Sequence, residues 1–195
     1  IKLEGMTLKS YLTNPALKLS STKDSQFIDI KLQGPWTQGS AITSTQIGLL
    51  MEATSTPVTT QNNNFEKLKV VGFSYGILSN HDVANNHFED CVLETLSYGV
   101  YWGRDTALGQ VAQATGPINN TITNSRFTNI DKTGYWVKEG KGNVSKENSF
   151  IKVGNDGGLD TAPVHAVIRF DADNNISKND FFARTESLMA NTSTM

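Results

Sequence analysis

The chain has 195 residues, an ordinary length for one domain and enough to bury a sizeable core. Lys and Arg number 17 against 19 Asp and Glu, so the formal net charge is -2, and the absence of any run of like charges argues against a dedicated electrostatic surface. The longest apolar stretches hold only a few residues, far short of the roughly 20 that span a bilayer, so we expect neither membrane insertion nor nucleic-acid binding.

The chain begins at Ile1, with no basic and then apolar leader ahead of its repeating pattern. We therefore interpret residues 1–195 as a single domain cut from a longer chain. Its one cysteine, Cys91, excludes an internal disulfide and supplies too few ligands for a zinc site. We expect the thiol in the core and predict no metal and no cofactor.

Asn, Ser and Thr are abundant while Leu and charged residues are sparse, which favours strands and turns over helices. The first clear strand is Phe27 to Gly34, where apolar and polar residues alternate. We expect loops over 35–47 and 54–63, which flank a strand over 48–53. The pattern of the first strand returns from Phe65 to Gly72, and we interpret the two as equivalent strands of a repeating structure.

A repeat of about 23 residues runs through the middle of the chain. Tyr75, in the sequence Ser-Tyr-Gly-Ile, returns one repeat later as Tyr98 in Ser-Tyr-Gly-Val. The same spacing separates two pairs of phenylalanines, Phe65 with Phe88 and Phe127 with Phe150.

Insertions interrupt this repeat between the strands. The step from Phe88 to Phe127, the next phenylalanine of the series, is longer than one repeat. We interpret the excess as an insertion of about 16 residues within 103–120, a stretch with the composition of a loop. The step from Phe150 to Phe181 also exceeds one repeat, so we expect a smaller insertion over 154–163.

A repeat of this length is too short for paired helices and suits a solenoid coil made of short strands. Because successive coils lie about 4.8 Å apart, aromatic residues one repeat apart can stack inside, and Asn at the turns can hydrogen-bond along the axis. The Asn residues that we place at turns are Asn85, Asn86, Asn124, Asn148 and Asn179. We predict an all-β, single-stranded right-handed parallel β-helix, a solenoid whose coils have the length of this repeat and carry loop insertions.

The Asn-x-Phe and Tyr-Gly-Ile elements resemble the pectate-lyase-like right-handed β-helix superfamily over Phe27 to Thr185, and more narrowly the β-helical tail and baseplate proteins of bacteriophages. The stretch from Asn124 to Gly158 is similar to virion structural proteins of cyanobacterial myoviruses. The resemblance implies the fold, but this fold hosts lyases, hydrolases, adhesins and structural spikes. The superfamily's pectinolytic motifs Asn-Thr-Asp, Asp-Asp, Gly-His-Gly and Arg-Ile-Lys are absent from the sequence.

Phage depolymerases often act through two carboxylates, whose separation decides whether the sugar centre is retained or inverted. If the chain is an enzyme, our catalytic candidates are Asp156 and Asp171, with Arg169 to hold a sugar carboxylate. The alternative interpretation, which we favour, is that these side chains belong to ordinary solvated strands and turns.

Two aromatic pairs follow glycines in neighbouring coils: Tyr101 with Trp102, and Tyr135 with Trp136. We expect the four rings to lie near one another on one face. They suit either a carbohydrate-binding platform or a protein interface or core, and we favour the second interpretation.

The function that we favour is a non-enzymatic structural and host-surface recognition module of a phage tail fibre, spike or baseplate. Its expected partners are other virion proteins and cell-surface polysaccharide, its expected assembly is a homotrimer, and its expected location is the virion tail or the extracellular space. One alternative is a polysaccharide depolymerase, a hydrolase or lyase of the same fold. A second alternative is a bacterial surface adhesin.

Overall fold

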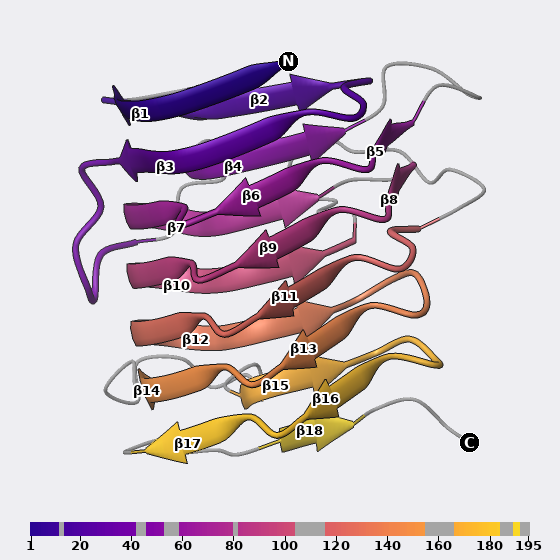
Figure 1. Ribbon diagram of the computed structural model, residues 1–195. Coiled ribbons are helices and arrows are strands. Elements are labelled where there is room, and N and C mark those ends of the chain that lie inside the picture. The colour runs from indigo at the N-terminus through magenta and orange to yellow at the C-terminus, as the bar shows by residue number, and fades with distance from the viewer. Residues whose placement is uncertain are drawn as a thin grey trace.

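Figure 1 shows a computed structural model of the chain, in which short strands are stacked coil on coil from the N-terminus to the C-terminus. The structure describes residues 1–11, 14–41, 46–52, 59–79, 82–103, 116–154, 166–183 and 189–191. Every regular element in these ranges is a β-strand, and every strand pair is parallel. The predicted all-β class and parallel solenoid-like arrangement are therefore confirmed. The same ranges hold no helix long and apolar enough to cross a membrane.

The strands are mostly short, and the longer ones continue through a corner of the coil. In chain order they are β1 (Lys2–Lys9), β2 (Leu17–Ser20), β3 (Gln26–Gln33), β4 (Ile47–Glu52), β5 (Thr60–Gln61), β6 (Asn64–Glu66), β7 (Lys69–Ser79), β8 (Val83–Ala84), β9 (His87–Glu89), β10 (Val92–Trp102), β11 (Thr121–Thr123), β12 (Arg126–Val137), β13 (Val144–Lys146), β14 (Ser149–Val153), β15 (Ala166–Phe170), β16 (Ile176–Lys178), β17 (Phe181–Ala183) and β18 (Met189–Asn191).

The strands line up in three rows, each built from one segment of successive coils. The first row runs β3, β6, β9, β11, β13, β16, and the second runs β3, β7, β10, β12, β14, β17. The second halves of β7, β10 and β12 form the third row with β2, β4, β15 and β18, while β5 and β8 pair in a separate two-stranded sheet. The sheet thus curls round on itself, as in a β-solenoid. We number the coils by their first-row strand: β1 for the first coil, then β3, β6, β9, β11, β13 and β16 for the second to the seventh.

The coils turn at residues with left-handed backbone. These positions form one line per corner: Gly5, Asp29, Lys67, Asp90, Asn124, Glu147 and Asn179 on the first; Asp24, Asn62, Asn85, Asn119, Gly142 and Asn174 on the second; Gly72, Thr95, Asn129 and Lys152 on the third. A single left-handed residue changes the chain direction sharply, and Asn, Asp and Gly adopt it at least cost. This explains the abundance of Asn and confirms the turn role predicted for Asn85, Asn124 and Asn179.

A second set of asparagines lies just after one of these corners and forms a ladder of Asn63, Asn86, Asn120, Asn143 and Asn175, in which the first four are buried and the last is half-buried. Each Nδ2 donates to Oδ1 of the next member, at 2.9, 2.9, 3.0 and 3.1 Å along the ladder. The backbone N–H donates to the same oxygen. Hydrogen bonding of asparagine along the axis is present as predicted, but of the five asparagines that we placed at turns only Asn86 belongs to this ladder. The ladder links coil to coil from the third to the seventh.

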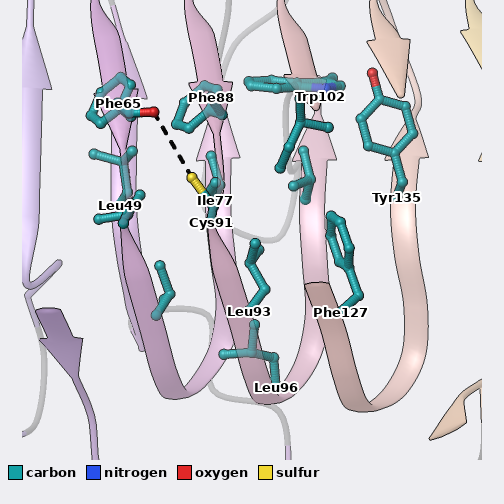
Figure 2. Packing of buried hydrophobic residues seen from close by; sticks show 14 of the residues in the cluster. Leu49, Phe65, Ile77, Phe88, Cys91, Leu93, Leu96, Trp102, Phe127 and Tyr135 are labelled. Atoms are coloured by element: carbon teal, nitrogen blue, oxygen red, sulfur yellow. Dashed lines mark hydrogen bonds between the residues drawn. The ribbon is translucent and has the colours of Figure 1, made fainter. Parts of the chain in front are cut away.

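Rings one coil apart stack inside the solenoid (Figure 2). One stack consists of Phe27, Phe65 and Phe88, with ring centroids 4.7 and 4.4 Å apart, and it lies in the first row. The other consists of Phe127, Phe150 and Phe182, at 4.4 and 5.5 Å, and it lies in the second row. The predicted stacking is present, but as two separate ladders.

The predicted alignment of Phe88 with Phe127 is wrong. Phe88 pairs with Ile122, while Phe127 pairs with Leu93. The step between equivalent ladder asparagines is 34 residues here, so the insertion in this coil is shorter than predicted. The error arose because both rows use phenylalanine on their inward side, and the two inward positions lie close together in one coil, as Phe88 and Leu93 do.

The predicted alignment of Phe150 with Phe181 is also wrong, by one residue. Phe150 pairs with Phe182, a step of 32 residues. Phe181 points outward and is 62 % exposed, because a shift of one residue along a strand reverses the side to which the side chain points.

Cys91 is buried among these rings, as the sequence predicted. Figure 2 shows it next to Phe88, and the dashed line joins its Sγ to the backbone oxygen of Phe65, 4.0 Å away.

Candidate functional site

A second hydrophobic cluster lies apart from the interior, on the third row of strands. We call it the outer aromatic cluster, and its members are Ile47, Leu50, Tyr75, Leu78, Tyr98, Tyr101 and Trp136. These residues come from β4, β7, β10 and β12, which lie side by side. The sheet therefore collects on this face the aromatic residues of several coils.

The rings of the outer aromatic cluster contact one another in a continuous chain. Tyr75 and Tyr98 are stacked, with centroids 5.1 Å apart. Tyr101 meets both rings edge-on at 5.8 and 5.9 Å. Trp136 lies 4.7 Å from the Tyr101 ring, and the ammonium of Lys138 lies 5.9 Å from the same ring. Because Tyr101 is only 3 % exposed and Trp136 only 8 %, their ring faces are not an open platform.

The glycines that follow Tyr75 and Tyr98 are required by close packing. A Cβ on Gly76 would lie 2.6 Å from the backbone oxygen of Gly99, and a Cβ on Gly99 would lie even closer to that of Gly134. Backbones of successive coils approach so closely here that a side chain has no room. The Ser-Tyr-Gly element thus combines an outward tyrosine with a tight coil-to-coil contact.

An ion pair closes one end of the cluster. Nε of Arg169, on β15, donates to Oδ1 of Asp171 at 2.9 Å, and Nε1 of Trp136 donates to Oδ2 of the same carboxylate at 2.8 Å. The guanidinium carbon lies 4.5 Å from the centroid of the Trp136 ring. The two charged side chains are only 18 % and 17 % exposed. Guanidinium, carboxylate and indole therefore hold one another in fixed positions.

The structure separates the four aromatics that we expected on one face. Tyr101 pairs with Trp136 on the outside, whereas Trp102 pairs with Val137 in the interior. Tyr135 is also interior, and neither it nor Trp102 is exposed at all. Only one member of each predicted pair, Tyr101 or Trp136, takes an outward position. The repeated tyrosines Tyr75 and Tyr98 occupy the neighbouring outward positions.

Two of the three predicted catalytic candidates lie together. Arg169 and Asp171 form the ion pair just described, while Asp156 lies outside the described residues. Both carboxylate oxygens of Asp171 accept hydrogen bonds, so the group is held as a fixed hydrogen-bond acceptor.

The interior contains two groups that could in principle act as nucleophiles, and burial suppresses both. Burial raises the pKa of the Cys91 thiol from 9.0 to about 12, so the thiol is protonated at neutral pH. Burial likewise raises the pKa of the Tyr135 hydroxyl, and the charge of Asp180 adds to the effect while the nearby Trp102 indole opposes it. Neither group is reactive where it lies.

In the described ranges, no three His, Cys, Asp or Glu side chains are grouped closely enough to hold a metal ion.

Sequence reasoning missed Tyr75 and Tyr98 as members of the site. Their signal was present in the recurrence of Ser-Tyr-Gly from one repeat to the next. Besides indicating the period, this recurrence places a tyrosine at the same outward position of two successive coils. Tyr75 and Tyr98 stand one coil apart in neighbouring strands, which is what allows their rings to stack.

Compared with protein-family models, curated proteins and solved structures, the chain matches none.

Proposed function

We propose that the chain is a structural and host-surface recognition module of a phage tail fibre, spike or baseplate, and that it performs no catalysis. The observation that carries the proposal is the asparagine ladder, which links successive coils through paired side-chain and backbone hydrogen bonds. Together with the two phenylalanine stacks, it favours a stiff rod whose coils resist local opening. A rod of this kind suits an appendage that bears load.

We also propose that the solenoid is a right-handed β-helix of the pectate-lyase-like type. Connections between parallel strands of one sheet are right-handed in about 98 % of cases, because of the right-handed twist of the strands. The rows of parallel strands are the arrangement to which this rule applies.

The recognition role rests on the resemblance to phage tail and baseplate proteins. We place it on the face of the outer aromatic cluster, whose packed rings hold the Arg169–Asp171 ion pair beside them in a fixed position. We propose other virion proteins and cell-surface polysaccharide as partners, with the virion tail or the extracellular space as the location.

The first test measures binding and turnover together. The purified chain is passed over a panel of immobilised bacterial surface polysaccharides, and the same polysaccharides are assayed for new reducing ends and unsaturated uronates. We expect binding to at least one member of the panel without turnover. Turnover would overturn the non-catalytic proposal, and a folded chain that binds no member of the panel would overturn the polysaccharide partner.

A polysaccharide depolymerase is the second candidate, favoured by the close grouping of Arg169, Asp171 and Trp136. If the chain depolymerises a polysaccharide, Asp171→Asn and Asp156→Ala should each abolish turnover. Asp173→Asn provides a matched control, because Asp173 is an exposed carboxylate two residues from Asp171. Equal turnover in all three variants would remove these carboxylates from the mechanism.

The homotrimer is part of the proposal. Ile176 and Phe181 lie on the seventh coil with 50 % and 62 % of their surface exposed, an unusual state for large apolar side chains, and it favours their burial in an assembly. Sedimentation equilibrium should give a mass three times the 21.3 kDa of one chain. A monomer at all concentrations would contradict the trimer without bearing on polysaccharide binding.

A further inference from the structure

Segment 34–41 leaves the second coil after β3 and is anchored on the third. Gly34 N–H donates to the Val71 carbonyl and Trp36 N–H to the Gly72 carbonyl, both at 2.9 Å. The Trp36 side chain is only 4 % exposed, although it belongs neither to the interior core nor to the outer aromatic cluster. An indole buried in this way fixes the root of the segment against the coil beneath it.

The tip of the segment is a turn with a defined conformation. Ser40 N–H donates to the Thr37 carbonyl at 3.1 Å, and the two hydroxyls lie 2.9 Å apart. Gly39 has a φ of 77°, which suits glycine at this turn position. The residues from Thr37 to Ala41 are exposed, yet the Gly39 N–H points inward and donates to Oδ2 of Asp131 at 2.8 Å.

Asp131 lies three coils further on, at an irregularity in β12. Leu96 pairs with Ile130 and Tyr98 with Thr133, so two residues of β12 face the single residue between them on β10. Such a β-bulge changes the direction in which its side chains point. Asp131 is itself only 4 % exposed. Figure 1 shows the loop after β3 running past β7 to the level of β10 and β12 before the chain returns to β4.

We infer that segment 34–41 is a latch that connects the second coil directly to the fifth. Trp36 holds its base through burial, and Asp131 holds its tip by accepting the Gly39 N–H. In a solenoid each coil otherwise contacts only its neighbours. The latch adds a contact across the third and fourth coils and couples the opening of the second coil to the integrity of the bulge in β12.

The hydrogen bond at the tip favours the closed latch. Nε1 of Trp36 is buried and makes no hydrogen bond to the described part of the chain, so its contribution is mainly packing. The tip contributes the charge-assisted bond from Gly39 to Asp131. Removing the carboxylate should therefore shift the latch toward the open state.

Hydrogen exchange followed by mass spectrometry on the full chain tests the latch. In Asp131→Ala we expect exchange over 34–41 to accelerate by about tenfold or more, since bonds to charged groups are the stronger class. Exchange in β6 and β9 should not change, and acrylamide should quench Trp36 fluorescence more strongly. Asp173→Ala is the matched control, because it removes an exposed carboxylate remote in sequence from the latch.

The indole signal is assigned with Trp36→Phe, which leaves Trp102 and Trp136 in place. If Asp131→Ala does not fold, Trp36→Ala loosens the latch from its anchor and should produce the same local acceleration over 37–41. Unchanged exchange over 34–41 in a folded Asp131→Ala or Trp36→Ala variant would overturn the latch, and so would an equal acceleration in Asp173→Ala.

Discussion

At the scale of single residues, the least favourable corner is Thr95. It has a φ of 55°, whereas its equivalents in other coils include Gly72 and Asn129. A β-branched side chain in the left-handed region is strained, and such residues cost of order 1–3 kcal/mol. Thr95→Asn should therefore raise the free energy of unfolding by about 1 kcal/mol, measured by urea denaturation.

Thr7→Asn is the control for this substitution, because Thr7 lies on β1 and is not among the residues with positive φ. Asn has a lower strand propensity than Thr, so the control should be neutral or slightly destabilised. A gain of stability in both variants would show that strain at Thr95 is not the cause.

The buried thiol of Cys91 should make the free energy of unfolding fall as the pH rises above 9. Burial raises the pKa of Cys91 from 9.0 in the unfolded chain to about 12 in the folded one. The protonated form that folding favours is present in both states below pH 9, so this part of the stability is complete there. As pH rises from 9 towards 12, only the unfolded state loses the proton, and stability falls by up to about 1.4 kcal/mol per pH unit.

Denaturation at pH 8 and pH 10 measures this effect. Cys91→Ala should be less stable at pH 8 but should lose less stability between the two pH values. At higher pH the buried Tyr135, whose pKa is raised above its ordinary 10.0, adds a similar loss in both proteins. An unchanged decline in Cys91→Ala would mean that the thiol is not the group responsible.

At the scale of elements, the asparagine ladder sets the strongest expectation. Oδ1 of Asn120 accepts from both the backbone N–H and Nδ2 of Asn86, and its Nδ2 donates to Asn143 and to the Val83 carbonyl. Asn120→Ala leaves several buried polar groups unpaired, each at roughly 1–3 kcal/mol. We expect a loss of about 3 kcal/mol or more in the free energy of unfolding.

An asparagine outside the ladder provides the control. Asn64→Ala alters an asparagine one residue beyond Asn63, on β6, whose side chain is not part of the ladder, and it should change stability by about 0.5 kcal/mol or less. If Asn120→Ala costs no more than Asn64→Ala, the ladder is not a source of stability.

The sequence was sufficient to predict the parallel solenoid, its period and the two uses of asparagine, because these depend on residues that recur at one fixed spacing. It was not sufficient for the register across insertions. Phe88 and Phe127 are chemically equivalent, and nothing local distinguishes an inward phenylalanine of the first row from one of the second. Only the pairing with Ile122 and Leu93 settles which row each belongs to.

A similar ambiguity of register explains why the two Tyr-Trp pairs do not share one face as predicted. Gly99 is followed by Val100, Tyr101 and Trp102, and Gly134 by Tyr135, so aligning the two Tyr-Trp pairs is off by one residue from aligning the glycines. The pairing of Val100 with Tyr135 follows the glycines. Since side chains alternate along a strand, that one residue decides which rings face out.

At the scale of the whole molecule, the interior changes character along the axis. Inward positions of the first row read Phe27, Phe65, Phe88, Ile122, Ser145 and Ser177 from the second coil to the seventh. The adjoining corner changes in the same direction, from the apolar Leu68 and Cys91 to Asn148 and Asp180. In the first row and at this corner, hydrophobic burial thus dominates the early coils and hydrogen bonds replace it in the late ones, while the stack of Phe127, Phe150 and Phe182 keeps the second row apolar.

Asp180 is the acceptor on which the late coils depend. Its carboxylate receives Asn148 N–H at 2.8 Å, the Ser145 hydroxyl at 2.8 Å and the Ser177 hydroxyl at 2.7 Å. In Asp180→Ala these donors lose their partner, and because solenoid coils are stabilised mainly by their neighbours, the damage should stay local. We expect hydrogen exchange in β13 and β14 to accelerate about tenfold or more, with β7 and β10 unchanged.

Asp173→Ala, which removes an exposed carboxylate nearby in sequence, should leave the exchange of all four strands as it is. An equal acceleration from β7 to β14 in Asp180→Ala would mean that the coils open as one cooperative unit. In that case the change from apolar to polar interior would not set a gradient of local stability along the solenoid. Acceleration confined to the late coils would place the weakest part of the rod where hydrogen bonds replace the stacked rings of the first row.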